Sequence, residues 1–208
     1  MSARRLAVVS AGLSQPSSTR LLADRLAAAT ATQLQTRGHD VQVDTIELRD
    51  HAHAVTDHLI TGFPSAELRA AVQAVTGADG LIAVTPVFTA SYSGLFKMFF
   101  DVLDADALAG KAVLVAATGG TERHSLVLDH ALRPMFGYLH SMVVPTGVYA
   151  ASSDWGPAQS DPAGGSRLAQ RIERAGGELA ELVSTRPSTG PVDAFADPTP
   201  FADLLAGR

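Results

Sequence analysis

The chain has 208 residues and is 46% hydrophobic, which is enough for one domain with a substantial core. Its net charge of −5 includes no basic stripe, which argues against nucleic-acid binding, and the absence of cysteine excludes disulfides and thiol chemistry. The apolar run after the basic residues 1–5 is too short for a signal peptide and no run could span a membrane, so we expect a cytoplasmic protein.

Short apolar runs alternate with helical stripes along the chain. The strands are expected at 5–10, 41–48, 81–84, 112–117 and 142–149, and the helices at 17–37, 66–76, 92–103, 125–140 and 166–183. Segment 49–65 is predicted to be irregular and segment 152–165 to be a turn-rich loop. This order predicts a doubly wound, five-stranded parallel sheet in three α/β/α layers. One domain is expected over residues 1–185, with an extended tail over 186–208.

The first strand leads through a polar turn into the first helix. Between positions 10 and 20 the turn gathers hydroxyls and one arginine, namely Ser10, Ser14, Ser17, Ser18, Thr19 and Arg20. A helix N-terminus with hydroxyl donors is a natural anion site. The turn has a single glycine, which disfavours a dinucleotide fingerprint, and the chain has no P-loop string. A terminal phosphate monoester, as in flavin mononucleotide (FMN), suits it best, although these hydroxyls could also serve only as a helix cap.

Two later turns follow the third and fourth predicted strands. The first contains Pro86, Val87, Phe88 and Thr89, and the second contains Thr118, Gly119, Gly120 and Thr121. Phe88 offers an aromatic face, and paired glycines allow the backbone to approach a flat ligand closely. Each turn alone would also fit an ordinary structural role. Ligands of doubly wound sheets bind at the carboxyl ends of the strands, where all three turns are expected.

Together the three segments resemble the NAD(P)H-dependent FMN reductase family. They are SQPSST at 14–19, TPVFTASYSGLFK at 85–97 and TGGTERHSLVLDHALRP at 118–134. The likeness covers roughly residues 4–150 and is greatest to reductases that supply reduced flavin to alkanesulfonate monooxygenases. It implies a flavodoxin-like fold, the FMN phosphate in the first turn, and the isoalloxazine ring against residues 86–89 and 119–121. It also implies a homo-oligomer, a dimer or tetramer, with the flavin site near a subunit boundary.

The expected activity is hydride transfer from NADH or NADPH to FMN, with a flavin-dependent monooxygenase as a candidate partner. The flavin supplies the chemistry, so no catalytic side chain is required, and His124 could contact flavin or nicotinamide. Three alternatives stay open. They are a quinone or azo reductase that retains FMN, a flavodoxin-like electron carrier without enzymatic activity, and a phosphosugar- or nucleotide-binding module.

Several other residues have competing interpretations. His51, His53 and His58 lack a nearby ligand cluster, so no metal site is predicted. Pro134 removes the hydrogen bond to the carbonyl of His130, so a kink or a π-bulge is expected in the helix that contains it. Trp155 either covers the nicotinamide site or packs on a neighbour. The aromatic residues Tyr92, Phe96, Phe99 and Phe100 suit a core or dimer surface, and Phe201, Leu204 and Leu205 form a candidate docking patch in the tail.

Overall fold

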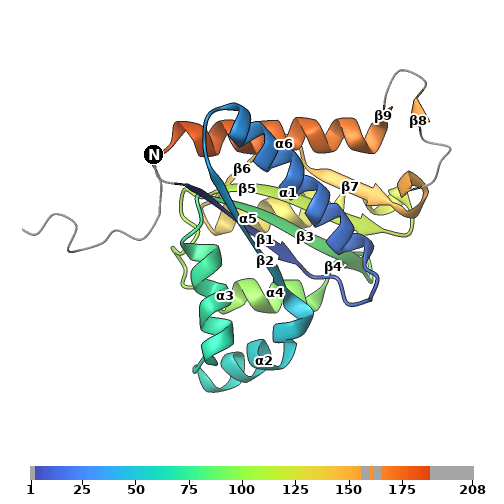
Figure 1. Ribbon diagram of the computed structural model, residues 1–208. Coiled ribbons are helices and arrows are strands. Elements are labelled where there is room, and N and C mark those ends of the chain that lie inside the picture. Colours follow the sequence, from blue (N-terminus) through green and yellow to red (C-terminus); the bar gives the residue numbers. More distant parts are fainter. Residues whose placement is uncertain (1–2, 156–159, 162–164, 188–208) are drawn as a thin grey trace, which may run out of the picture.

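The computed structural model describes residues 3–155, 160–161 and 165–187, and its centre is a parallel sheet (Figure 1). The strands are β1 (Arg4–Ser10), β2 (Val41–Glu47), β3 (Gly80–Phe88), β4 (Ser91–Tyr92), β5 (Ala112–Gly119), β6 (Met142–Val143) and β7 (Val148–Ala151). Their order is β2-β1-β3-β5-β6. The strand β5 pairs with β6 near its start and with β7 near its carboxyl end. This is the strand order of flavodoxin-like folds, and it confirms the doubly wound sheet. A separate pair, β8 (Ser160–Asp161) and β9 (Gly165–Ser166), is antiparallel.

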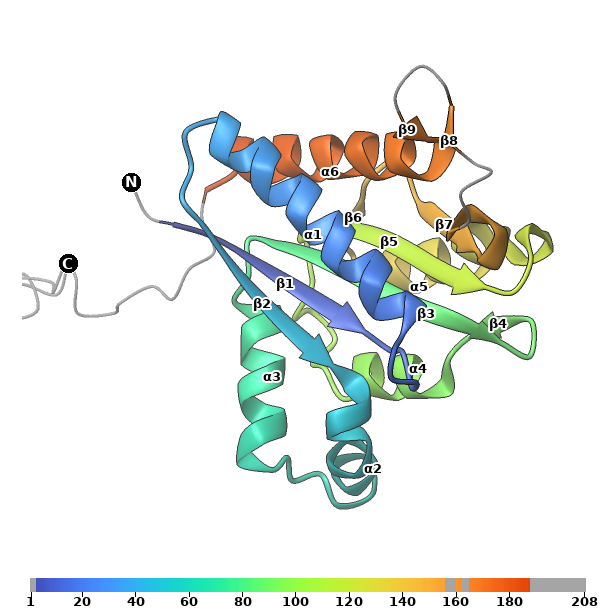
Figure 2. The same cartoon turned by 45° about the vertical axis from the view of Figure 1, so that its right-hand side comes forward.

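Helices cover both faces of the sheet, which confirms the three layers (Figures 1 and 2). One face carries α1 (Ser18–Thr36) and α6 (Arg167–Thr185), and the other carries α2 (Ala52–Thr61), α3 (Ala66–Thr76), α4 (Gly94–Asp101) and α5 (Arg133–Tyr138). Successive strand residues point to opposite faces, so Val8 joins the α1–α6 core while Val9 joins the core on the other side. Both are fully buried, as expected for a central parallel strand.

The carboxyl-terminal end of α6 is fastened to the amino edge of the sheet. The Arg4 guanidinium donates a 2.9 Å hydrogen bond to the carbonyl of Arg186 and lies 3.8 Å from the carboxylate of the buried Asp79. The Arg186 guanidinium in turn donates to the carbonyl of Gly110. Residues at both ends of the described chain therefore meet at this edge.

The prediction of an irregular segment over residues 49–65 was wrong. A 3₁₀ turn over Leu48–His51 continues into α2, which ends at Gly62. Only Val55 of α2 is buried, so the helix lacks the apolar stripe by which helices are found in a sequence. Gly62 adopts a left-handed φ of 77° and closes the helix rather than marking a loop.

The predicted helix over residues 92–103 begins later than expected. Tyr92 lies instead in a two-residue hairpin, in which Val87 pairs with Tyr92 and Phe88 with Ser91. Thr89 and Ala90 form its turn with positive φ values of 48° and 68°. Positive φ at both central positions matches the twist of a tight hairpin, but without glycine it is hard to recognise from the sequence.

The helix around Pro134 contains the expected irregularity. Residues Leu128–Leu132 form a π-helical turn that continues into α5, with Pro134 in the first turn of α5. Because proline has no N–H, the preceding turn widens instead of closing a regular α-helical hydrogen bond. The prediction of a π-bulge is confirmed, and His130 lies within it.

The predicted strand over residues 142–149 is two strands separated by a break. Pro145 cannot donate to a β-ladder, so β6 stops before it and β7 resumes at Val148. The break is held from α6, where the Glu178 carboxylate accepts hydrogen bonds of 2.7 Å from both the amide and the hydroxyl of Thr146. Burial raises the pKa of Glu178, but the bonds from Thr146 and Arg174 outweigh it, so its pKa lies below the ordinary value.

We expect Thr146→Val to lower the free energy of unfolding by about 1 kcal/mol at pH 7, the usual net worth of one hydrogen bond. A carboxyl group whose pKa is depressed by folding contributes stability above its unfolded pKa and loses it as pH falls through the folded pKa. The difference between wild type and variant should therefore shrink below about pH 4.5, the ordinary value for Glu. Urea unfolding at pH 7 and pH 3 measures this difference. Thr56→Val, which removes an exposed intrahelical bond, is the control, and a difference that does not depend on pH would contradict the assignment.

Candidate functional site

Three loops meet at the carboxyl edge of the sheet because the strands before them are in register (Figure 2). Ser10 of β1 pairs with Val84 of β3, and Pro86 of β3 pairs with Thr118 of β5. The loops enclose a cavity of about 340 Å³. Its lining consists of Gly12, Leu13, Ser14, Ser17, Ser18, Thr19, Pro86, Val87, Phe88, Thr118, Gly119, Gly120 and Ser152. We call it the edge cavity.

The first loop presents the N-terminus of α1 to the edge cavity. Ser17 is the N-cap, and its hydroxyl accepts a 3.2 Å hydrogen bond from the amide of Arg20 while its proton stays free to donate. A Cβ atom on Gly12 would lie 2.1 Å from the Ser17 hydroxyl oxygen and 3.1 Å from Cβ of Thr19. The loop is therefore too compact for a side chain at Gly12. Its donors lie close together, as is needed to bind an anionic group.

Hydroxyl contacts join the loops to one another. The buried hydroxyls of Thr19 and Thr118 are 2.8 Å apart, which ties α1 to the end of β5. The Thr85 hydroxyl accepts a 3.0 Å bond from the amide of Ser93 and donates to the carbonyl of Pro86, which fixes the second loop. The cavity walls are thus built without charged side chains.

The third loop is shaped by a tyrosine. The Tyr149 hydroxyl donates a 2.7 Å hydrogen bond to the carbonyl of Thr121, and burial, with Asp154 and Glu122 nearby, raises its pKa. A Cβ atom on Gly119 would lie 2.1 Å from that hydroxyl, whereas one on Gly120 would meet nothing within 4 Å. Gly119 is required for packing, and Gly120 leaves the cavity open to a flat ligand.

Most of the residues predicted for the site line this cavity. They are Ser14, Ser17, Ser18, Thr19, Pro86, Val87, Phe88, Thr118, Gly119 and Gly120. Ser10, Arg20, Thr89, Thr121 and His124 do not. Ser10 is buried beneath the first loop with no hydrogen-bond partner for its hydroxyl among the described residues. Thr121 contributes its carbonyl to Tyr149, while Thr89 lies at the hairpin tip and His124 in the 3₁₀ turn Glu122–His124.

Gly12, Leu13 and Ser152 line the cavity although they were not predicted. Gly12 and Leu13 belong to the turn that the sequence already singled out. Ser152 follows β7, and the rule that ligands bind at strand ends would have included it if β7 had been placed correctly.

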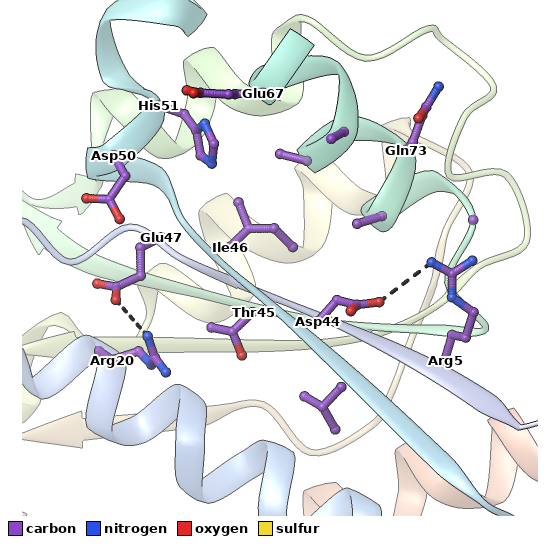
Figure 3. A pocket seen from close by; sticks show the side chains of 15 residues that line it. Arg5, Arg20, Asp44, Thr45, Ile46, Glu47, Asp50, His51, Glu67 and Gln73 are labelled. Carbon is purple, nitrogen blue, oxygen red and sulfur yellow. Dashed lines mark hydrogen bonds and ion pairs between the residues drawn. The ribbon is translucent and has the colours of Figure 1, made fainter.

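Arg20 points away from the edge cavity. Its Nε donates a 2.7 Å bond to Asp24, and a terminal nitrogen donates a 2.6 Å bond to Glu47 (Figure 3). The Asp24 bond is the main reason that its pKa is raised. Glu47 also lies 3.2 Å from the guanidinium of Arg49, so one carboxylate bridges two arginines beneath the first loop.

A larger cavity of about 850 Å³ lies at the outer edge of β2 against α3 (Figure 3). It contains both signs of charge: Arg5 lies 3.6 Å from Asp44, and Glu67 and His51 also line it. Of the residues predicted for the site, only Arg20 lines it, and its guanidinium is paired with Asp24 and Glu47. Its charges are largely compensated, so the edge cavity is the better candidate site.

Trp155 packs rather than standing over the edge cavity. Its ring lies against the α1–α6 core, and the guanidinium of Arg25 is 5.0 Å from the ring centroid. Phe201, Leu204 and Leu205 lie outside the described residues. The aromatic side chains Phe96, Phe99 and Phe100 are buried in the core on the α4 side.

Residues 4–156 match the family model described as NADPH-dependent FMN reductase. The chain belongs to this family. Over 183 residues it is 39% identical to the NADH-dependent FMN reductase SfnF of Pseudomonas fluorescens, covering 87% of this chain and 92% of that protein. It is 40% identical to FMN reductase (NADPH) of Pseudomonas aeruginosa, over 73% of this chain and 78% of that protein.

The X-ray structure of an oxidoreductase from Corynebacterium diphtheriae is similar over 89% of this chain and 99% of that one, with 48% identity and a TM-score of 0.84. Membership confirms the resemblance found in the sequence and makes the protein an FMN reductase that uses NAD(P)H. No helix within the described parts of the chain has the length and apolar character to cross a membrane.

The edge cavity fits FMN in its donor chemistry. Hydroxyls and free helix amides suit a phosphate monoester, and a lining without acidic side chains does not repel it. Phe88 and the backbone at Gly119–Gly120 offer flat surfaces to an aromatic ring. Among the described residues no group of three or more His, Asp or Glu side chains could hold a metal ion.

Proposed function

We propose that this FMN reductase binds FMN in the edge cavity, with the phosphate at the first loop and the ring between Pro86–Phe88 and Gly119–Gly120. One observation carries this proposal. The hydroxyl-rich N-terminus of α1 and the two ring-facing loops line a single cavity. FMN accepts the hydride from NADH or NADPH, and the side chains bind and orient it rather than take part in the chemistry. Ser14, Ser17, Ser18 and Thr19 are the phosphate donors.

We infer that reduced FMN leaves the protein and supplies a flavin-dependent monooxygenase. The first-loop contacts are hydrogen bonds without a paired cation, and the cavity mouth is flanked by exposed apolar side chains, Leu13 and Phe88. Such a mouth suits passage of flavin and transient docking of a partner. A quinone or azo reductase would instead retain its flavin.

Anaerobic turnover with NADH or NADPH and excess FMN, followed by ultrafiltration, tests both statements. We expect more than one equivalent of reduced FMN per protomer in the filtrate. NAD(P)H oxidation with all flavin retained would favour the quinone or azo reductase. FMN binding without NAD(P)H oxidation would favour an electron carrier, and no FMN binding would overturn the proposal.

We further propose a homo-oligomer, since the surface of α5 and β6 exposes Tyr138 by 83% and Met142 by 40%. Light scattering after gel filtration tests this.

Residues 1–185 are proposed to be one reductase domain, because α6 packs on α1 up to Val183. A cytoplasmic location is consistent with the supply of a diffusible reduced flavin.

A further inference from the structure

A smaller cavity of about 320 Å³, which we call the second cavity, is partly lined by two of the loops that form the edge cavity. The two cavities have no lining residue in common, but nearby residues of the same two loops line both. Phe88 lines the edge cavity, and Ala90 and Ser91 of the same hairpin line the second. Likewise Gly120 lines the edge cavity, and Arg123 of the same loop lines the second. These lining residues are two and three positions apart, which places the two cavities close to one another along both loops.

Every ionisable residue that lines the second cavity is basic. Arg123, His124 and His130 face it, together with Ala90, Ser91, Leu126, Val127 and Ala131. The neighbouring acidic residues do not line this cavity. Asp129 lies 3.0 Å from Arg133, and Glu122 lines a different cavity with Arg167 and Arg171. Within the described chain the Arg123 side chain has no ion pair or hydrogen bond, so its donors are available to a ligand.

Two unusual backbone features hold this wall in place. Thr89 has a left-handed φ of 48°, which a β-branched residue rarely adopts, and Ala90 follows at 68°. The π-turn Leu128–Leu132 contains His130 and Ala131, which also line the cavity. Such departures from regular geometry persist where the surrounding structure requires them, often at ligand sites.

We propose that the second cavity holds the phosphate groups of the nicotinamide nucleotide, with Arg123 as its main contact. This rests on the proposed function, because the nicotinamide must reach the flavin ring in the edge cavity. NADH and NADPH share a pyrophosphate, and NADPH carries a further 2′-phosphate. An unpaired guanidinium beside two imidazoles is suited to these oxygens, whereas the edge cavity has no cation in its lining.

The test compares hydride donors with and without phosphate. Arg123→Gln is assayed with NADH, with NADPH and with 1-benzyl-1,4-dihydronicotinamide, which lacks phosphate and adenosine. We expect KM for NADH and NADPH to rise roughly fivefold to tenfold, as for loss of one charge-assisted contact, with little change in kcat. Arg123→Lys should recover part of the loss. Arg69→Gln removes the same charge from an exposed position on α3 and should leave both KM values unchanged.

The dependence of KM on ionic strength is a second readout. KM for NADH in the wild type should rise with salt, and the rise should be smaller in Arg123→Gln, because screening acts on the removed charge. An equal loss with the phosphate-free donor would assign Arg123 to the flavin end, and unchanged KM values for NADH and NADPH would remove it from the donor site. Either result overturns the inference. Failure of the wild type to reduce FMN would instead overturn the proposed function, so the two failures are distinguishable.

Discussion

Replacing Gly12 with alanine is expected to weaken FMN binding about tenfold to a hundredfold. The new Cβ would lie 2.1 Å from the Ser17 hydroxyl oxygen and 3.1 Å from Cβ of both Ser17 and Thr19, so the hydroxyl must rotate away or the loop must move. Either response removes hydrogen bonds to the phosphate, and one bond to a charged group is worth about 1.5–3 kcal/mol. Fluorescence titration of FMN measures the change in Kd.

Riboflavin, which has the ring but no phosphate, sharpens this test. Gly12→Ala should change the Kd for riboflavin much less than the Kd for FMN, since the crowding is confined to the first loop. Gly137→Ala is the matched control, because its Cβ would meet nothing within 4 Å and Gly137 does not line the edge cavity. Equal weakening of both flavins would show that the substitution disturbs the ring site or the fold instead.

Gly176→Val is expected to be the most destabilising exchange among the glycines of α6. At Gly176 the helix crosses α1 so closely that a Cβ would lie 3.0 Å from Cβ of Ala29 and 3.0 Å from the amide nitrogen of Thr30. A valine side chain would push the two helices apart. Overpacking of this kind costs about 1–3 kcal/mol, which lowers Tm by about 2–4 °C per kcal/mol in a chain of this size.

Gly177 provides a matched control one residue away. A Cβ there meets nothing within 4 Å, so Gly177→Val adds the same side chain to the same helix without a clash. Its Tm should stay at or slightly above that of the wild type, because valine has a better helix propensity than glycine. Thermal unfolding followed by circular dichroism gives both values. Similar losses in both variants would mean that α1 and α6 are not packed as described.

The sequence predicts the bounds of β1, β2 and β5 and the turn before α1 well, because their signals are local. The continuous apolar run at 81–84 is typical of a buried parallel strand, and the hydroxyls around Ser17 are typical of a helix N-terminus. Both patterns can be read from a few neighbouring residues. The ends of parallel strands then lie at one edge, so the composition of the site follows from the strand order. For this reason Thr19 and Thr118, 99 positions apart, were both predicted, although their mutual hydrogen bond was not.

What could not be predicted depends on tertiary partners. Arg20 is near the first loop in sequence, but Asp24 and Glu47 bind its guanidinium, and Glu47 comes from β2. A count of charges along the chain does not show which pairs form. The α2 helix was missed because only Val55 is buried, so no apolar stripe marks it in the sequence. His124 lines the second cavity and not the edge cavity. The sequence does not show which of the two cavities it faces, because the geometry of the turn Glu122–His124 decides that.

The fastening of α6 at the amino edge has a practical consequence. Arg4 and Arg186 hold the end of the described chain at the amino edge of the sheet, whereas the edge cavity lies at the carboxyl edge. Pro187, the last described residue, is exposed at the amino edge. A linker attached to an exposed side chain at the amino edge would orient the molecules on an electrode or a bead, with the edge cavity toward the solution. Diffusing dinucleotides and flavin would then reach the cavity from the solution rather than from the side of the support.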